Sequence, residues 1–219
     1  MSPQLKNKSQ HYFSVEGETE KWYLDWLQDE INAHPAATKT AVIRSKVEKN
    51  PISYAKSLNI ISKTVVTHWF DYESNDQVHV TQFLETLALL KEANRIKQIK
   101  YLLGYSNLTF ELWMVLHKQN CNGHVTHRDH YIRHVNSAFT EDFPNLNTYK
   151  AEANFKRCLR KLTINDVKAA IDRAKYIMQQ NQQNSLQLYE HCGFKYYRDN
   201  PSLTIHESVE RILKDCGLL

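Results

Sequence analysis

Glycine and proline are scarce in this chain, with five residues of each among 219. That scarcity disfavours an all-β sandwich, which needs many tight turns, and favours long helices joined by few turns. No apolar run approaches the roughly 20 residues of a membrane span, and the opening MSPQLKNKSQ lacks the apolar core of a signal peptide. The four cysteines lie far apart without a CxxC pair, as is typical of reduced thiols. We therefore expect a cytoplasmic globular protein.

Two chemical motifs are also missing. The chain has no GxxxxGK[ST] phosphate loop, so we do not expect it to hydrolyse ATP or to carry a nucleotide cofactor of its own. Ser106 and His117 have no GxSxG turn and no third partner, which argues against a nucleophile-and-base hydrolase. A composition of 42% hydrophobic and 24% charged residues is ordinary for a globular domain with a sizeable core.

The charge is unevenly distributed along the chain, although its net value is only +4. Residues 1–36 hold three lysines against six acids, a net charge of −3. Residues 150–175 hold eight Lys and Arg against three acids, a net charge of +5. The basic segment either attracts phosphates or is simply the solvated face of helices, and charge alone favours the second interpretation.

Hydrophobic periodicity predicts strands that alternate with helices in the first half of the chain. The predicted strands are 11–15, 38–47, 64–71 and 96–106. The predicted helices are 18–33, 50–63, 81–95 and 110–118. After about residue 120 only helical patterns remain, with a polar loop at 181–187. We expect an α/β, Rossmann-like parallel four-stranded sheet flanked by helices, formed by residues 1–120, with a helical region, 121–219, packed on it.

Acidic side chains follow two of the predicted strands. Glu16 comes directly after HYFSV, and Asp71 and Glu73 lie at the end of TVVTHWFD and just beyond it. The carboxyl ends of parallel strands share one edge of a sheet, so these three carboxylates are expected to meet there. Hard oxygen ligands suit Mg²⁺ or Mn²⁺, and a bound ion would relieve the repulsion among them.

Simpler interpretations exist for each acid. Glu18 and Glu20 fall in the first turn of a helix, where negative charge favours the positive end of the helix dipole. That effect explains Glu18 fully and Glu20 partly, but not Glu16, which still belongs to the end of the strand. Asp71 alone would be an ordinary turn or N-cap residue.

Four motifs together carry a resemblance to a known family. They are VEGETE (15–20), FDYE (70–73), SNLTFELWMVLH (106–117) and NPSLTIHESVERIL (200–213). Over almost the whole chain they resemble the RloB-like proteins, a family with a Toprim-type metal-binding domain that is associated with bacterial abortive-infection and restriction loci. The SN…FELW…LH block is the most specific of the four.

The resemblance implies a Toprim-like endonuclease that uses one or two Mg²⁺ or Mn²⁺ ions. Glu16, Asp71 and Glu73 would bind metal, and Glu16 would also act as general base or acid for the attacking water. Glu20 would be a ligand or a neighbour of the ligands, and Glu111 a further ligand or the residue that orients its loop. Family members usually carry two aspartates where this chain has Asp71 and Glu73, so a weaker site or a preference for Mn²⁺ is expected.

The resemblance also implies a substrate and a setting. Ser106, Asn107 and His117 of the matched block, together with Lys150, would bind the substrate, with Lys150 stabilising phosphate charge. The substrate would be DNA or RNA, tRNA included, cut as the effector step of anti-phage defence with a separate partner ATPase. The alternative is a non-catalytic metal-binding or regulatory subunit of such an ATPase complex.

Two other side-chain groups admit a choice. Cys121, His124, His127 and His130 have spacings that resemble zinc sites, but a surface helix carrying polar histidines is the simpler interpretation. Trp22, Trp26 and Trp113 recur at helical spacing, which favours core positions over base-stacking platforms.

Overall fold

The computed structural model describes residues 7–219; residues 1–6, on which part of the signal-peptide prediction depends, lie outside it. Its main sheet has the order β2-β1-β3-β4-β7, with four parallel strands and an antiparallel fifth at the edge. The strands are β1 (Lys8–Val15), β2 (Thr40–Val47), β3 (Thr64–Tyr72), β4 (Ile99–Asn107) and β7 (Ser202–Leu203). The predicted α/β class with a parallel four-stranded core is therefore confirmed.

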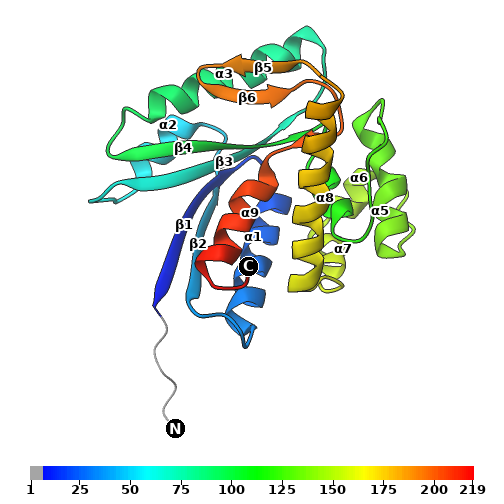
Figure 1. Ribbon diagram of the computed structural model, residues 1–219, viewed down its shortest axis with the longest axis horizontal. Helices are drawn as coiled ribbons and strands as arrows, with labels where there is room; N and C mark the ends of the chain where they lie inside the picture. Colours follow the sequence, from blue (N-terminus) through cyan, green and yellow to red (C-terminus); the bar gives the residue numbers. More distant parts are fainter. Residues whose placement is uncertain (1–6) are drawn as a thin grey trace.

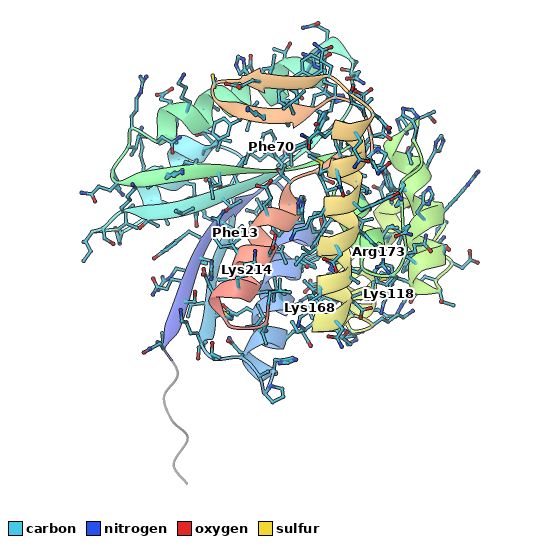
Figure 2. All side chains as sticks on the ribbon, in the orientation of Figure 1. Phe13, Phe70, Lys118, Lys168, Arg173 and Lys214 are labelled. Carbon is cyan, nitrogen blue, oxygen red and sulfur yellow. The ribbon has the colours of Figure 1, made fainter. Side chains whose placement is uncertain are left out.

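Alternation along the strands divides the interior into two cores. Phe13 and Trp69 belong to the larger core, whereas Phe70 and Tyr72 belong to the smaller one on the opposite face of the sheet. Phe13 and Phe70 mark the two faces in Figure 2. The smaller core lies beneath α2 (Pro51–Ser57) and α3 (Gln77–Ala93), which cover one face of the sheet (Figure 1).

The larger core fills the other face of the sheet. Helices α1 (Glu18–Ala33) and α9 (Ile205–Asp215) pack there together with the helices of the second half (Figure 1). Those helices are α4 (Glu111–Leu116), α5 (Tyr131–Phe139), α6 (Leu146–Lys150), α7 (Glu152–Leu159) and α8 (Ile164–Gln183). A 3₁₀ turn, η1 (Arg128–His130), leads into α5. This core runs through both halves of the chain, and the division at residue 120 stays a prediction.

The expectation that strands end before residue 120 is wrong. Besides β7, the chain forms a hairpin of β5 (Leu188–His191) and β6 (Phe194–Tyr197). These strands are too short to show a sequence period, and tertiary contacts hold them in place: Tyr196 stacks on Tyr189 and packs against Phe83 of α3, with centroids 4.9 Å apart.

Several predicted boundaries also shift. Helix α8 continues to Gln183, so the predicted loop at 181–187 begins later than expected, and the buried Asn181 donates a hydrogen bond to the Pro201 carbonyl at 2.9 Å. Asn50 caps α2 through Ile52 and Ser53 N–H groups, but this helix ends at Ser57.

Among residues 7–219, no helix combines the length and apolar character needed to cross a bilayer.

Candidate metal centre and nucleic-acid site

The strand order creates a switch point between β1 and β3. From the carboxyl end of β1 the chain crosses to β2 on one side, and from β3 it crosses to β4 on the other. Ligands of open α/β sheets bind where such connections diverge. Glu16 follows β1 at this point, and its Oε2 accepts a hydrogen bond from the Asp71 N–H of β3 at 3.1 Å. The two strand ends that the sequence singled out therefore meet at one edge of the sheet.

Asp71 faces the helical half of the molecule. Its neighbours Phe70 and Tyr72 point into the core under α2 and α3, so strand alternation directs Asp71 to the opposite face. On that face lie Glu20, at the start of α1, and Glu111, at the start of α4.

The carboxylates line a pocket of about 270 Å³ that opens at this edge, which we call the acidic pocket. Glu111 lies behind it, fully buried. The lining residues are Glu16, Gly17, Glu18, Thr19, Glu20, Trp22, Asp71, Glu73, Arg128 and Lys150.

Burial disfavours the ionised form of the three inner carboxylates, Glu16, Glu20 and Asp71. It raises the pKa of Asp71 well above the ordinary 3.8, and the negative charges of Glu20 and Glu16 add to the effect. The pKa of Glu20 is raised, again chiefly by burial, although a hydrogen bond donated by Thr19 at 2.8 Å opposes it. The pKa of Glu16 is raised by burial too, against the opposing effect of the Asp71 N–H. Clustered acids with raised pKa values in a cleft are typical of functional sites.

Lys150 supplies positive charge from the helical half. Lys150 is the last residue of α6, and its Nζ lies 3.2 Å from Glu111 Oε1. Burial by itself lowers the pKa of this ammonium, but the carboxylates of Glu111, Asp71 and Glu20 outweigh it, so the pKa of Lys150 is raised. Glu111 accepts a hydrogen bond from the Thr109 hydroxyl through its other oxygen. Its Oε1 is buried, and Lys150 is the cation paired with it among the described residues.

Glu73 lines the acidic pocket but is held at its rim. Its Oε2 lies 3.0 Å from Arg128 Nη1 of η1 and 3.4 Å from His79 Nε2 of α3. These pairs are half-exposed, so they hold the Glu73 carboxylate only weakly.

The donor set of the acidic pocket suits a hard divalent ion. All its acidic donors are carboxylate oxygens, the ligand type of Mg²⁺ and Mn²⁺. Within residues 7–219, however, no three His, Cys, Asp or Glu side chains are already arranged as an ion-binding group. To bind a metal ion, the carboxylates would therefore have to rotate away from the cations that now pair with them, which are Lys49, Arg128 and Lys150.

Three residues predicted to bind substrate lie in the interior instead. Ser106 Oγ donates to the Thr109 carbonyl at 2.9 Å, and Asn107 Nδ2 donates to the Arg198 carbonyl at 2.9 Å. His117 Nδ1 donates to the Trp113 carbonyl, its Nε2 pairs with the Tyr23 hydroxyl at 3.1 Å, and burial lowers its pKa to about 4.

These three interior residues do not line the acidic pocket, and each is at most 1% exposed. Ser106 fixes the turn through Thr109, whose hydroxyl holds Glu111. The SN…FELW…LH block therefore positions Glu111 from behind the pocket, and a substrate-binding role for its three buried residues stays a prediction.

Sequence reasoning missed two cations at the rim of the acidic pocket. Lys49, between β2 and α2, places its Nζ 3.7 Å from Glu16 Oε1, and Arg128 pairs with Glu73. Lys49 gives no signal in the sequence, and Arg128 stands among the histidines that were weighed as zinc ligands. Only the folded chain brings either residue to the acids.

The histidine-rich segment offers no zinc cluster within the described part of the chain. Cys121 is buried, and the His127 ring caps η1 through the Asp129 N–H. Trp113 is fully buried, as expected for a core position, while Trp22 and Trp26 pack against the core partly exposed.

The basic segment 150–175 is largely paired within the chain. Arg157 and Lys161 hold Glu141, while Lys156 and Lys175 pair with Glu152 and Glu210. Arg173, labelled in Figure 2, donates to the carbonyls at the end of α4. The segment is therefore not a continuous unpaired stripe.

The profile of a family described as RloB-like protein covers residues 12–212, nearly the whole described chain. No curated protein and no solved structure matches.

Proposed function

Since the chain belongs to the RloB-like family, we propose that it is a Toprim-like endonuclease that hydrolyses phosphodiester bonds of DNA or RNA, tRNA included, with Mg²⁺ or Mn²⁺. The observation that supports this most is the meeting of Glu16, Glu20 and Asp71 in one pocket at the β1–β3 switch point. A protein keeps several half-buried carboxylates together at a cost, and a divalent ion offsets that cost.

In this proposal some carboxylates of the acidic pocket bind the ion and another accepts a proton. Asp71 and Glu20 line the acidic pocket and interact electrostatically; they would hold the ion, with Glu73 joining them once it leaves Arg128. The ion would polarise the phosphate and lower the pKa of a bound water. Glu16, the more exposed of the inner acids and raised in pKa, can take the proton of the attacking water.

Cations at the rim solve a second problem. A nucleic acid is a polyanion, and the acidic pocket repels it unless positive charge is close by. Lys49, Arg128 and Lys150 come from three different segments and surround the acids. They can bind the phosphates on either side of the cleaved bond. Glu111 lies behind the pocket, pairs with Lys150 and holds its ammonium close to the acids.

We further propose that the nuclease is the effector of bacterial anti-phage abortive infection and works with a separate ATPase in the cytoplasm. Family membership supports the setting. The lack of a phosphate loop supports a separate ATPase, and the four free cysteines suit a reducing compartment.

The test is cleavage of single- and double-stranded DNA, RNA and tRNA by the purified protein with Mg²⁺ or Mn²⁺. Glu16→Gln should slow cleavage by about a hundredfold or more, the range for loss of a proton-transfer group. Asp71→Asn removes a charged ligand of the ion and should slow cleavage at least as much. Glu18→Gln is the matched control, because Glu18 lines the same pocket but is exposed in the first turn of α1. It should cleave at nearly the wild-type rate.

Two results would count against the nuclease. Undiminished cleavage by both Glu16→Gln and Asp71→Asn would refute this site. No cleavage of any substrate, with the ATPase present or absent, would favour the non-catalytic subunit.

A further inference from the structure

Lys150 enters the acidic pocket on a fixed backbone but through a flexible side chain. Helix α6 is anchored by the fully buried Tyr149, which packs against Phe143 and Phe155. The next residue, Lys150, remains 28% exposed and extends its ammonium to Glu111. A four-carbon stem lets such an ammonium swing through several ångströms while its Cα stays in place.

The charges around this ammonium do not balance. Glu111 faces it at 3.2 Å, and the carboxylates of Asp71 and Glu20 also attract it. One positive charge thus serves three buried or half-buried acids, and Glu16 lies beside Asp71 with its own distant partner, Lys49, at 3.7 Å. An ammonium offers three donors and a single charge, whereas a divalent ion offers twice the charge to the same oxygens.

We propose that the Lys150 ammonium holds the place of a cation in the metal-free acidic pocket, and that a divalent ion displaces it towards the substrate phosphate. This inference rests on the proposed function, because it takes the acidic pocket to be the metal site. The ammonium and a metal ion are attracted by the same carboxylates and repel each other, so the ion weakens the hold of these carboxylates on Lys150.

The exchange orders the events at the site. Before metal binds, Lys150 is tied to Glu111 and is withdrawn from a phosphate at the rim. Once the ion neutralises the carboxylates, the ammonium is released and becomes a phosphate ligand. Binding of nucleic acid through Lys150 then depends on the metal, and the empty site does not retain nucleic acid through this residue.

Metal affinity tests the exchange without any cleavage. Mn²⁺ binding is measured by titration calorimetry on the full chain and on Lys150→Met, which keeps the apolar stem and removes the charge. The variant should bind Mn²⁺ about tenfold more tightly, equal to about 1.4 kcal/mol. Its metal-free form should melt below the wild type, and saturating Mn²⁺ should raise its melting temperature by more than it raises that of the wild type.

Lys118→Met is the matched control. Lys118 also belongs to the helical half, where Figure 2 labels it, is 26% exposed and pairs with Asp166 at 3.0 Å, outside the acidic pocket. This variant should bind Mn²⁺ like the wild type. Lys150→Arg, which keeps the charge, should stay close to wild-type affinity. If Lys150→Met does not fold, Lys150→Gln takes its place in the titration.

Failure of the exchange can be told from failure of the nuclease. Mn²⁺ binding to Lys150→Met that is no tighter than to the wild type, or a matching gain in Lys118→Met, overturns the exchange and leaves the metal site intact. If neither the wild type nor Lys150→Met binds Mn²⁺, the metal site and the exchange both fall.

Discussion

The two ends of the central sheet carry opposite charge and differ in size. The acidic pocket at the carboxyl end encloses about 270 Å³, and a cavity at the amino end, which we call the basic cavity, encloses about 940 Å³. The charged residues that line the basic cavity are Arg44, Lys63, Lys100, Arg211 and Asp215, beside His11. The larger hollow is therefore not the one that gathers interacting acids.

The difference shows that burial of like charges locates chemistry better than volume does. In the basic cavity Arg44, Lys63 and Lys100 are exposed, so solvent screens them from one another at little cost. In the acidic pocket burial raises the pKa of Asp71, and the neighbouring acids raise it further. Buried acids that raise one another's pKa values are typical of a functional site.

The strongest test of this comparison reverses charge in the basic cavity. The double variant Lys63→Glu, Lys100→Glu should fold normally, because exposed substitutions change the free energy of unfolding by about 0.5 kcal/mol or less. It should cut nucleic acid at nearly the wild-type rate, because both lysines line the basic cavity and not the acidic pocket. Asp71→Asn should lose activity about a hundredfold or more by comparison. Rates are measured at about 0.15 M salt, where long-range attraction of the substrate is screened. An equal loss in the double variant would place the substrate on the wrong end of the sheet.

The backbone of the site could be predicted from the sequence. HYFSV and TVVTHWFD read as parallel strands, and parallel strands end at one edge, so the meeting of Glu16 with Asp71 follows from alternation alone. The cations could not be predicted in the same way. The positions of these cations depend on how loops and helices from distant segments pack against the sheet, as seen for Lys49, Arg128 and the Lys150–Glu111 pair. Local sequence patterns do not encode that packing.

The matched block at residues 106–117 shows a second limit. A motif gives positions along the chain but not the direction of side chains. Asn107 and His117 stand where a substrate-binding role was predicted, yet they hydrogen-bond to Arg198 and Trp113 inside the molecule. The β5–β6 hairpin was not predicted for a related reason: its strands have only four residues and are held by tertiary contacts, such as Tyr196 packing against α3.

A test of intermediate size concerns stability without metal. Asp71→Asn should stabilise the metal-free protein at pH 8 by about 1–3 kcal/mol, because it removes a poorly solvated charge from among other acids. For a chain of this size each kcal/mol corresponds to about 2–4 °C in melting temperature. Thermal unfolding in the presence of a chelator measures the change.

The pH dependence of that gain has a definite sign. A carboxyl whose pKa is raised by folding binds its proton more tightly in the folded state, so its contribution to stability falls as pH rises through the raised pKa. Below the ordinary 3.8 the penalty is absent. The gain from Asp71→Asn should therefore be largest at pH 8 and shrink towards pH 4. The exposed Asp29→Asn is the control, and a variant less stable than the wild type at every pH would contradict the prediction.

The smallest expected effect comes from shortening Glu73 to aspartate. Glu73 now reaches Arg128 at 3.0 Å, and Glu73→Asp draws the carboxylate back towards the end of β3 and Asp71. Losing this half-exposed ion pair should cost at most about 1 kcal/mol of stability. Because Mg²⁺ demands stricter octahedral geometry than Mn²⁺, a carboxylate closer to the strand end should shift the ratio of the two affinities about two- to fivefold towards Mg²⁺.

Displacement of bound Mn²⁺ by Mg²⁺ measures that ratio in the wild type, Glu73→Asp and Glu73→Gln. The glutamine variant keeps the length of the side chain and removes its charge, so it should weaken both ions without changing their ratio. An unchanged ratio in Glu73→Asp would put residue 73 outside the reach of the ion. Its part would then be to hold Arg128 and His79 at the rim, and the acids nearer the ion would be Glu16, Glu20 and Asp71.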